Sequence, residues 1–278
     1  MQVPAPSYVA VNGRKIAYDE VAPEMPARTV LLISGLGAKR LGWYKQLPVF
    51  GARYRTIAMD NRDIGDSDLV EAPYRTADQA DDAAALLHAL GIERAAVVGI
   101  SMGGFIALEL ALRHPELVEK LVLTSTSAGG RTHVQPGWRM RMMLGMPRFV
   151  PRWLRPEAGT VARRTYASIM APGYCAAHPD DWEHIAEIAR YRVQPAAAYM
   201  RQLNACLGHD ASARLGTITA PTLVVHGTVD PLVPPANGEY LAAHIPGARL
   251  IRYPATGHVP IIERADDYNR DVLAFLAE

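Results

Sequence analysis

The chain has 278 residues, a formal net charge of +1 and a hydrophobic fraction of 49%. So large a hydrophobic fraction supplies a sizeable core and excludes a disordered chain. The near-neutral charge creates no global field for nucleic acid, so we expect no nucleic-acid partner. Two cysteines are too few for a disulfide framework. No run of 18 apolar residues predicts a transmembrane helix, and the first residues lack a secretory pattern, so we expect a cytoplasmic protein.

The first predicted element is a β-hairpin. Two short apolar runs at residues 8–11 and 15–18 flank Asn12-Gly13, a dipeptide typical of a type I′ turn. Six near-continuous apolar runs then have the pattern of strands that are covered on both faces, at residues 29–34, 54–60, 95–100, 117–125, 222–226 and 248–253. Helical patterns separate or follow them at residues 76–90, 102–113, 236–244 and 267–277. This alternation predicts an α/β fold with a mostly parallel central sheet and helices on both faces.

The alternation stops between the fourth and fifth of these runs. Residues 127–212 have a helical character with many proline breaks, and they contain three of the four tryptophans. We therefore expect an inserted helical cap at residues 127–212 and a core domain formed by residues 1–126 and 213–278.

Ser101 is the candidate nucleophile. Gly99-Ile100-Ser101-Met102-Gly103 follows an apolar run and opens a helical run. This is the G-x-S-x-G pattern in the strand–turn–helix context that the motif requires. A sharp turn from strand to helix strains the serine backbone, and the two flanking glycines leave room for it. The motif predicts a serine hydroxyl that is exposed above the sheet, at a helix N-terminus that favours developing negative charge.

Asp230 and His258 are the candidate acid and base. Each lies in a short loop directly after a predicted strand, within Gly227-Thr228-Val229-Asp230 and Gly257-His258-Val259-Pro260. The carboxyl ends of parallel strands meet at one sheet edge, so these side chains should gather near Ser101. The chain order Ser, Asp, His is one of the known orders of a catalytic triad. His226 ends a predicted strand, and we expect it to be a packed or capped residue.

These motifs resemble those of the α/β-hydrolase superfamily over essentially the whole chain. Residues 60–67, Asp-Asn-Arg-Asp-Ile-Gly-Asp-Ser, are similar to the family's D-x-R-x-x-G-x-S turn. The resemblance implies the α/β-hydrolase fold with an inserted helical cap, and an oxyanion hole from the backbone N–H groups of Leu36 and Met102. Ser34-Gly35 stands where the family commonly has His-Gly. This change leaves open how the loop is braced, and we expect that Ser34 adds a hydroxyl to the pocket.

The resulting functional expectation is a serine hydrolase that cleaves a carboxylic ester through an acyl-enzyme, with no cofactor and no metal site. The substrate is expected to be a small or medium, largely apolar ester or lactone. A lactonase or enol-lactonase and a carbon–carbon bond hydrolase remain alternatives, because the same nucleophile and oxyanion hole serve those reactions. From another class, a hydrolase-like small-molecule receptor also remains, and the sequence leaves a homodimer open.

A methionine-rich stretch at residues 138–146 is the candidate substrate pocket, because methionine adapts to irregular apolar surfaces. The predicted lining residues are Ser34, Trp138, Met142, Met143 and Val259. Ordinary cap packing is the alternative that we favour for the methionines. Residues 131–164 also contain eight arginines and one acid. We expect these arginines to pair with acids of the core rather than to attract anionic substrates or a membrane surface.

Overall fold

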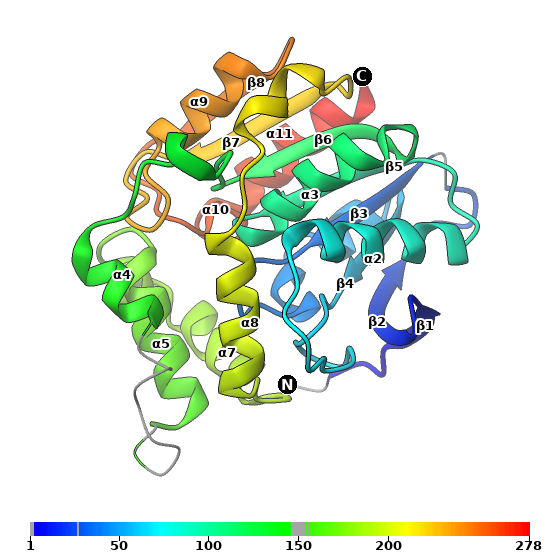
Figure 1. Cartoon of the computed structure of the whole chain (residues 1–278). Coiled ribbons are helices and arrows are strands. Elements are labelled where there is room, and N and C mark those ends of the chain that lie inside the picture. The colour runs from blue at the N-terminus through cyan, green and yellow to red at the C-terminus, as the bar shows by residue number, and fades with distance from the viewer. Residues whose placement is uncertain (1–2, 27, 146–153, 155) are drawn as a thin grey trace.

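The computed structural model describes residues 3–26, 28–145, 154 and 156–278 (Figure 1). Its centre is an eight-stranded sheet in the order β1-β2-β4-β3-β5-β6-β7-β8. The strands are β1 (Ser7–Val11), β2 (Arg14–Val21), β3 (Thr29–Ile33), β4 (Arg55–Met59), β5 (Ala95–Ile100), β6 (Val118–Thr124), β7 (Thr222–Gly227) and β8 (Arg249–Tyr253). β2 pairs antiparallel with both of its neighbours, β1 and β4. All other neighbouring strands of the sheet pair parallel. The predicted mostly parallel sheet is confirmed.

The hairpin at the sheet edge has the turn that its sequence predicts. Asn12 has a φ of 49° and Gly13 a φ of 75°. Positive φ at both central residues is the requirement of a type I′ turn, which matches the twist of the flanking strands. The turn joins Val11, the last residue of β1, to Arg14, the first residue of β2, and these two residues pair with each other.

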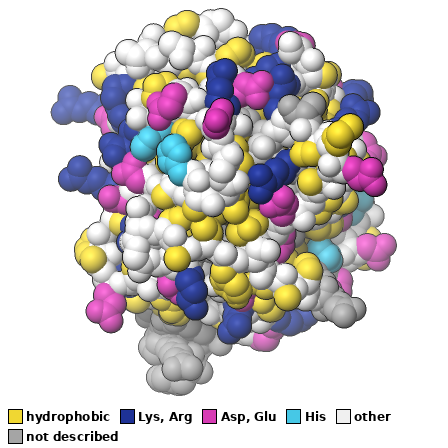
Figure 2. All heavy atoms as spheres, turned by 90° about the vertical axis from the view of Figure 1, so that its right-hand side faces the viewer, with side chains coloured by type: hydrophobic (Ala, Val, Ile, Leu, Met, Phe, Trp, Pro, Cys, Tyr) yellow, Lys and Arg dark blue, Asp and Glu magenta, His cyan; other side chains and the backbone are white. Residues whose placement is uncertain are grey.

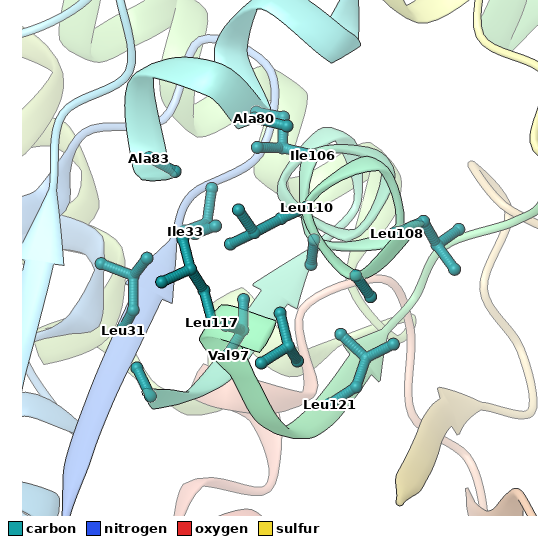
Figure 3. Close-up of a cluster of buried hydrophobic side chains, with 14 of the residues drawn as sticks. Leu31, Ile33, Ala80, Ala83, Val97, Ile106, Leu108, Leu110, Leu117 and Leu121 are labelled. Carbon is teal, nitrogen blue, oxygen red and sulfur yellow. The ribbon is translucent and has the colours of Figure 1, made fainter. Parts of the chain in front are cut away.

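Helices cover both faces of the sheet, as the alternating pattern predicts. Side chains alternate along a strand, so Leu31 and Ile33 of β3 enter one core cluster while Val30 and Leu32 enter the other. The first cluster lies under α2 (Thr76–Ala89), α3 (Met102–Arg113) and α9 (Ala236–His244), and its part beneath α2 and α3 is drawn in Figure 3. The second lies under α1 (Leu47–Gly51), α10 (Pro260–Glu263) and α11 (Ala265–Ala277). Burial of both faces accounts for the near-continuous apolar runs.

The chain between β6 and β7, here called the cap segment (residues 127–212), is helical in its described part. Its α-helices are α4 (Trp138–Gly145), α5 (Ala158–Ile169), α6 (Tyr174–Ala177), α7 (Pro179–Arg190) and α8 (Ala196–Leu207). Gly129 and Asp210 form an isolated β-bridge, and Ala211 N donates to Ala128 O at 2.8 Å. The start and the end of the cap segment therefore lie side by side.

The described surface carries charges of both signs. Figure 2 shows basic and acidic side chains interspersed on the face that forms the right-hand side of Figure 1. Within the described residues, every helix is too short or too polar to cross a bilayer. Cys175 and Cys206 are both free thiols.

Candidate active site

Ser101 lies at the turn between β5 and α3, in the predicted strand–turn–helix context. Its backbone has φ 56° and ψ −121°, a strained conformation for a residue with a side chain. A Cβ at Gly99 would lie 2.2 Å from Gly103 O, and a Cβ at Gly103 would lie 2.1 Å from Ile33 O. Both positions therefore require glycine, and the close backbone packing holds Ser101 at the N-terminus of α3.

Asp230 and His258 lie on the loops that follow β7 and β8, the last two strands of the sheet. The two loops are bonded to each other, because Val229 N donates to Thr256 O at 3.0 Å. His258 Nδ1 lies 2.8 Å from Asp230 Oδ2, and both residues are buried. The structure therefore brings the predicted acid and base into direct contact.

The Asp230 carboxylate is held in its charged form. Its Oδ1 accepts hydrogen bonds of 2.9 Å from the backbone N–H groups of Leu232 and Val233. Burial raises the pKa of Asp230, but the nearby His258 and His226 outweigh burial and lower this pKa to about 2. An ionised Asp230 accepts the Nδ1 proton of His258, which leaves Nε2 of that ring as the free proton acceptor.

His226 is a second imidazole at the same carboxylate. Its Nε2 lies 2.8 Å from Val233 O and 3.4 Å from Asp230 Oδ2. A backbone carbonyl can only accept, so Nε2 carries the proton. On the other side of the ring, a Cβ at Gly238 would lie 2.4 Å from His226 Nδ1. His226 is packed, as expected, and it also braces the loop that carries Asp230.

Ser101 and His258 are not joined by a hydrogen bond in this structure. Among the described residues, neither Ser101 Oγ nor His258 Nε2 has a hydrogen-bond partner. Contacts between a nucleophile and its base are often long without substrate and tighten in the reacting complex. The placement of Ser101 as nucleophile therefore rests on its strained turn and on the sheet edge that it shares with Asp230 and His258.

The loop after β3 lies against Ser101. A Cβ at Gly35 would be 3.2 Å from Ser101 Cβ. Within the described part of the chain, the backbone N–H groups of Leu36 and Met102 have no hydrogen-bond partner. Free donors on either side of a nucleophile are the elements of an oxyanion hole. The loop is also braced from within, because the Ser34 hydroxyl donates to Lys39 O at 3.1 Å. This bond turns the Ser34 hydroxyl toward its own loop.

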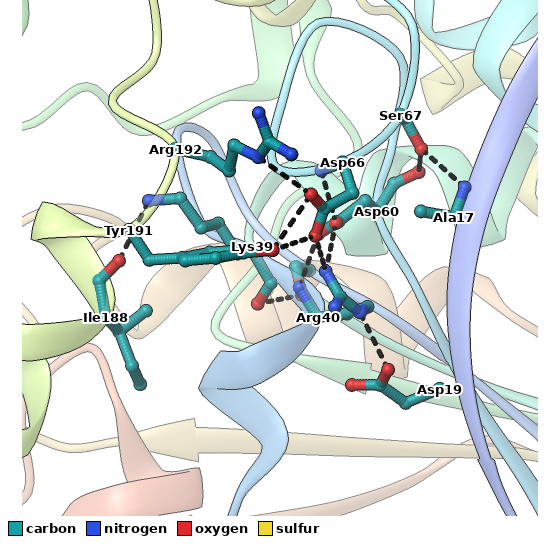
Figure 4. Close-up of polar contacts among 11 residues, drawn as sticks. Ala17, Asp19, Lys39, Arg40, Asp60, Asp66, Ser67, Ile188, Tyr191 and Arg192 are labelled. Carbon is teal, nitrogen blue, oxygen red and sulfur yellow. Dashed lines mark hydrogen bonds and ion pairs between the residues drawn. The ribbon is translucent and has the colours of Figure 1, made fainter. Parts of the chain in front are cut away.

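A buried charged network supports this loop (Figure 4). Arg40 is 1% exposed, and its Nη1 lies 2.7 Å from Asp60 Oδ2 and 2.8 Å from Asp66 Oδ2. Its Nε contacts Asp19 Oδ1 at 2.9 Å. Ser67 Oγ donates to Asp60 O at 2.7 Å. The D-x-R-x-x-G-x-S turn therefore contributes Asp60, Asp66 and Ser67 to the network around Arg40.

Helix α8 contacts the loop after β3 and the turn at residues 60–67 through polar side chains that were not predicted from the sequence. Gly37 N donates to Gln202 Oε1 at 3.1 Å, and Gln202 Nε2 donates to Arg62 O at 3.0 Å. Arg201 binds the buried Asp63 carboxylate through two hydrogen bonds of 2.8 Å. These partners are at least 138 residues apart in sequence. No local pattern could have revealed them.

The predicted pocket residues divide into two groups. Trp138 and Met142 are 61% and 60% exposed, so both lie on the outer side of α4. Met143 is partly buried and packs against the core cluster that contains Val259 and Ile100. Val259 and Ile100 are the chain neighbours of His258 and Ser101. Met143 and Val259 therefore lie at the buried core cluster, whereas Trp138 and Met142 face solvent. Met146, the last residue of the methionine-rich stretch, lies outside the described residues.

The arginines at residues 131–164 were expected to pair with acids of the core. For Arg163 this expectation is wrong, because its ion-pair partner Glu183 belongs to the cap segment. The Arg139 guanidinium lies 5.4 Å from the ring centre of Trp138. The predictions for Arg148, Arg152 and Arg155 lie outside the described residues. Over the described ranges, no group of three His, Cys, Asp or Glu side chains has the arrangement of a metal site.

Comparison with known proteins assigns the family. Residues 28–265 match the family model of the alpha/beta hydrolase fold. The chain is 34% identical over 272 residues to a Variovorax paradoxus protein with the provisional name carbamate hydrolase RutD, which covers 93% of this chain and 95% of that protein. It is 31% identical over 270 residues to a Mycobacterium tuberculosis protein with the provisional name non-heme bromoperoxidase BpoC, covering 94% and 97%.

A solved structure agrees with the sequence relatives. The enol-lactonase from Burkholderia xenovorans LB400 superposes with a TM-score of 0.85 at 26% identity, covering 98% of this chain and 100% of that one. The chain therefore belongs to the α/β-hydrolase family and is a hydrolase.

Proposed function

We propose that this chain is a serine hydrolase that cleaves the carboxylic ester bond of a small or medium, largely apolar substrate through an acyl-enzyme. One observation carries the proposal: the buried 2.8 Å contact between His258 Nδ1 and Asp230 Oδ2. It occurs on the sheet edge at which Ser101 occupies a strained turn. A histidine held by a buried carboxylate, on the same sheet edge as a serine in a strained turn, is the arrangement expected to activate a serine.

In the first half of the proposed reaction, Ser101 Oγ attacks the ester carbonyl carbon while His258 Nε2 takes the hydroxyl proton. The N–H groups of Leu36 and Met102 donate to the carbonyl oxygen as it becomes negative. Donors of this kind contribute ~10²–10³ in rate each. The carbon–oxygen bond then breaks, and His258 returns the proton to the leaving alcohol. In the second half, His258 activates a water that hydrolyses the acyl-Ser101 ester and releases the acid.

The cap segment is proposed to form a helical cap over this edge, with residues 1–126 and 213–278 as the core domain. Apolar residues next to the reacting groups support an apolar substrate, since Ile100 and Val259 belong to one buried cluster. Met143 packs against the same cluster from α4. The proposed steps use only groups of this chain and water, so they require no cofactor.

Lactones and carbamates are the second candidate substrates. The Burkholderia xenovorans neighbour is an enol-lactonase, and the Variovorax paradoxus relative has the provisional name of a carbamate hydrolase. Esters, lactones and carbamates all present a carbonyl carbon to the serine and place negative charge on the same oxygen. They differ in the leaving group, which the cap segment would select.

The test is the hydrolysis of nitrophenyl esters from acetyl to decanoyl by the wild-type protein and by Ser101→Ala. We expect the variant to lose turnover by a factor on the order of 10⁶. Ser168→Ala is the matched control, because Ser168 is exposed on α5, and it should behave as wild type. Turnover by Ser101→Ala within tenfold of wild type would refute the proposal. If the wild-type protein does not hydrolyse these esters but hydrolyses a lactone or a carbamate, that compound class replaces esters as the proposed substrate.

A further inference from the structure

Glu263 binds the main chain on both sides of His258. It is the last residue of α10, the short helix that follows the loop after β8 (Figure 1). Its Oε2 accepts from Gly257 N at 2.9 Å, and its Oε1 accepts from Val259 N at 3.0 Å. Oε2 also accepts from Ala171 N, in the cap segment, at 2.7 Å. One carboxylate thus holds three main-chain N–H groups, and two of them belong to the neighbours of the proposed base.

The N–H group of His258 itself is held by the cap segment. His258 N donates to Ile169 O, at the end of α5, at 2.8 Å. Of the three consecutive amides at residues 257, 258 and 259, those of residues 257 and 259 therefore bind Glu263, and that of His258 binds the cap segment. A Cβ at Gly257 would lie 2.5 Å from Ile169 O and 2.6 Å from Ala171 N. The histidine loop and the end of α5 are thus in direct backbone contact.

These contacts restrain the ring of His258 at both ends. Asp230 fixes the imidazole through Nδ1, while Glu263 and the cap segment fix the backbone from which the ring projects. Hydrogen bonds to a carboxylate are stronger than those to a neutral acceptor. Within the described residues, Glu263 forms no ion pair, so its carboxylate is directed to the main chain alone.

We infer that Glu263 is a positioning residue for His258, and that it joins the proposed base to the segment after α5. This inference rests on the proposed function, in which His258 is the base. Glu263 does not touch substrate. It sets the position of His258 Nε2 relative to Ser101 Oγ, and it makes that position depend on how residues 169–171 of the cap segment are seated.

A purely structural role for Glu263 makes a different prediction. If Glu263 only completes α10 and the contact between cap and core, its loss lowers stability and leaves the rate of each active molecule unchanged. A positioning role lowers kcat with little change in KM, because substrate contacts are intact while the proton acceptor is displaced. A displacement of about 1 Å costs on the order of 10²-fold in rate.

The experiment compares Glu263→Gln with Asp181→Asn, both confirmed as folded by circular dichroism. Glutamine keeps the shape of the side chain but offers one acceptor oxygen and turns an NH₂ toward a main-chain donor. Asp181 is the matched control, since it accepts from Tyr44, Lys45 and Tyr174 between core and cap segment without touching residues 257–259. Two rates are measured: ester turnover, and covalent labelling of Ser101 by a nitrophenyl phosphonate, which needs the base but no natural substrate.

For Glu263→Gln we expect kcat and the labelling rate to fall together by roughly 10- to 100-fold, with KM within about twofold of wild type. Asp181→Asn should keep both rates. Wild-type rates in folded Glu263→Gln, or equal losses in both variants, would overturn the inference. If wild type itself is not labelled, the proposed function fails and takes this inference with it. If Glu263→Gln does not fold, Glu263→Asp replaces it, and a wild-type kcat in that variant also overturns the inference.

Discussion

His258 Nδ1 lies 2.8 Å from Asp230 Oδ2, and the same carboxylate oxygen lies 3.4 Å from His226 Nε2. Its second oxygen is occupied by two backbone N–H groups. Within the described residues, every hydrogen bond to this carboxylate comes from a donor, so the fold stabilises the charged form. This environment fixes which nitrogen of His258 carries the proton.

Asp230→Asn is expected to lower kcat by about 10⁴-fold, because the amide NH₂ of asparagine faces His258 Nδ1 and favours the wrong tautomer. The fold should survive, since the amide oxygen still accepts from Leu232 and Val233. Steady-state kinetics on the preferred nitrophenyl ester measures the effect. Asp266→Asn, on the exposed start of α11, serves as control. A loss below tenfold in Asp230→Asn would contradict the role of Asp230.

Gly103→Ala is expected to destabilise the turn at Ser101, because the added Cβ would meet the backbone oxygen of Ile33 at 2.1 Å. Backbone cannot move aside as a side-chain tip can, so we expect a loss of about 3 kcal/mol in the free energy of unfolding. Gly42→Ala is the matched control, since a Cβ there meets nothing within 4 Å. Urea unfolding of both variants decides the matter, and equal stabilities would argue against a steric need for Gly103.

The buried His209 predicts a loss of stability in acid. Burial lowers the pKa of His209 to about 4, although Glu109 lies 3.6 Å away. The unfolded chain binds this proton below pH ~6.5, whereas the folded protein binds it only near pH 4. The free energy of unfolding should therefore fall by about 3 kcal/mol between these values.

His209→Gln tests this assignment, because glutamine can still bond Thr76 but does not titrate. Urea unfolding at pH 7 and pH 4.5 should show a smaller decrease in stability for this variant than for wild type. His244→Gln, which replaces an exposed histidine, should keep the wild-type decrease. An unchanged decrease in His209→Gln would assign the acid sensitivity to other groups.

Met143 and Met142 form a matched pair of variants for testing the proposed substrate pocket, because Met143 packs against the buried core cluster and Met142 is 60% exposed. Truncating Met143 to alanine should enlarge the proposed pocket and shift the ester preference toward longer acyl chains by about tenfold. Met142→Ala should leave the preference unchanged. The nitrophenyl ester series measures both. Identical profiles for the two variants would remove Met143 from the pocket.

Much of the fold and the three central residues could be predicted from the sequence alone. Strands buried on both faces need near-continuous apolar runs, and the turn at Ser101 needs glycine at residues 99 and 103. Both requirements are local, so a few adjacent residues are enough to predict the strand or the turn. The order of Ser101, Asp230 and His258, each after its own strand, then predicts their gathering at one sheet edge.

The tertiary structure alone decided which residues support that edge. The hydrogen bond from Ala171 N to Glu263, 92 residues away, and the one from Gly37 N to Gln202, 165 residues away, join side chains to distant backbone groups. The outward direction of Trp138 and Met142 likewise depends on how α4 packs against the rest of the chain. Nearly every residue has the same backbone donor and acceptor, so the sequence does not indicate which backbone group a distant side chain will bind. Only the packing of the whole chain brings such partners within bonding distance.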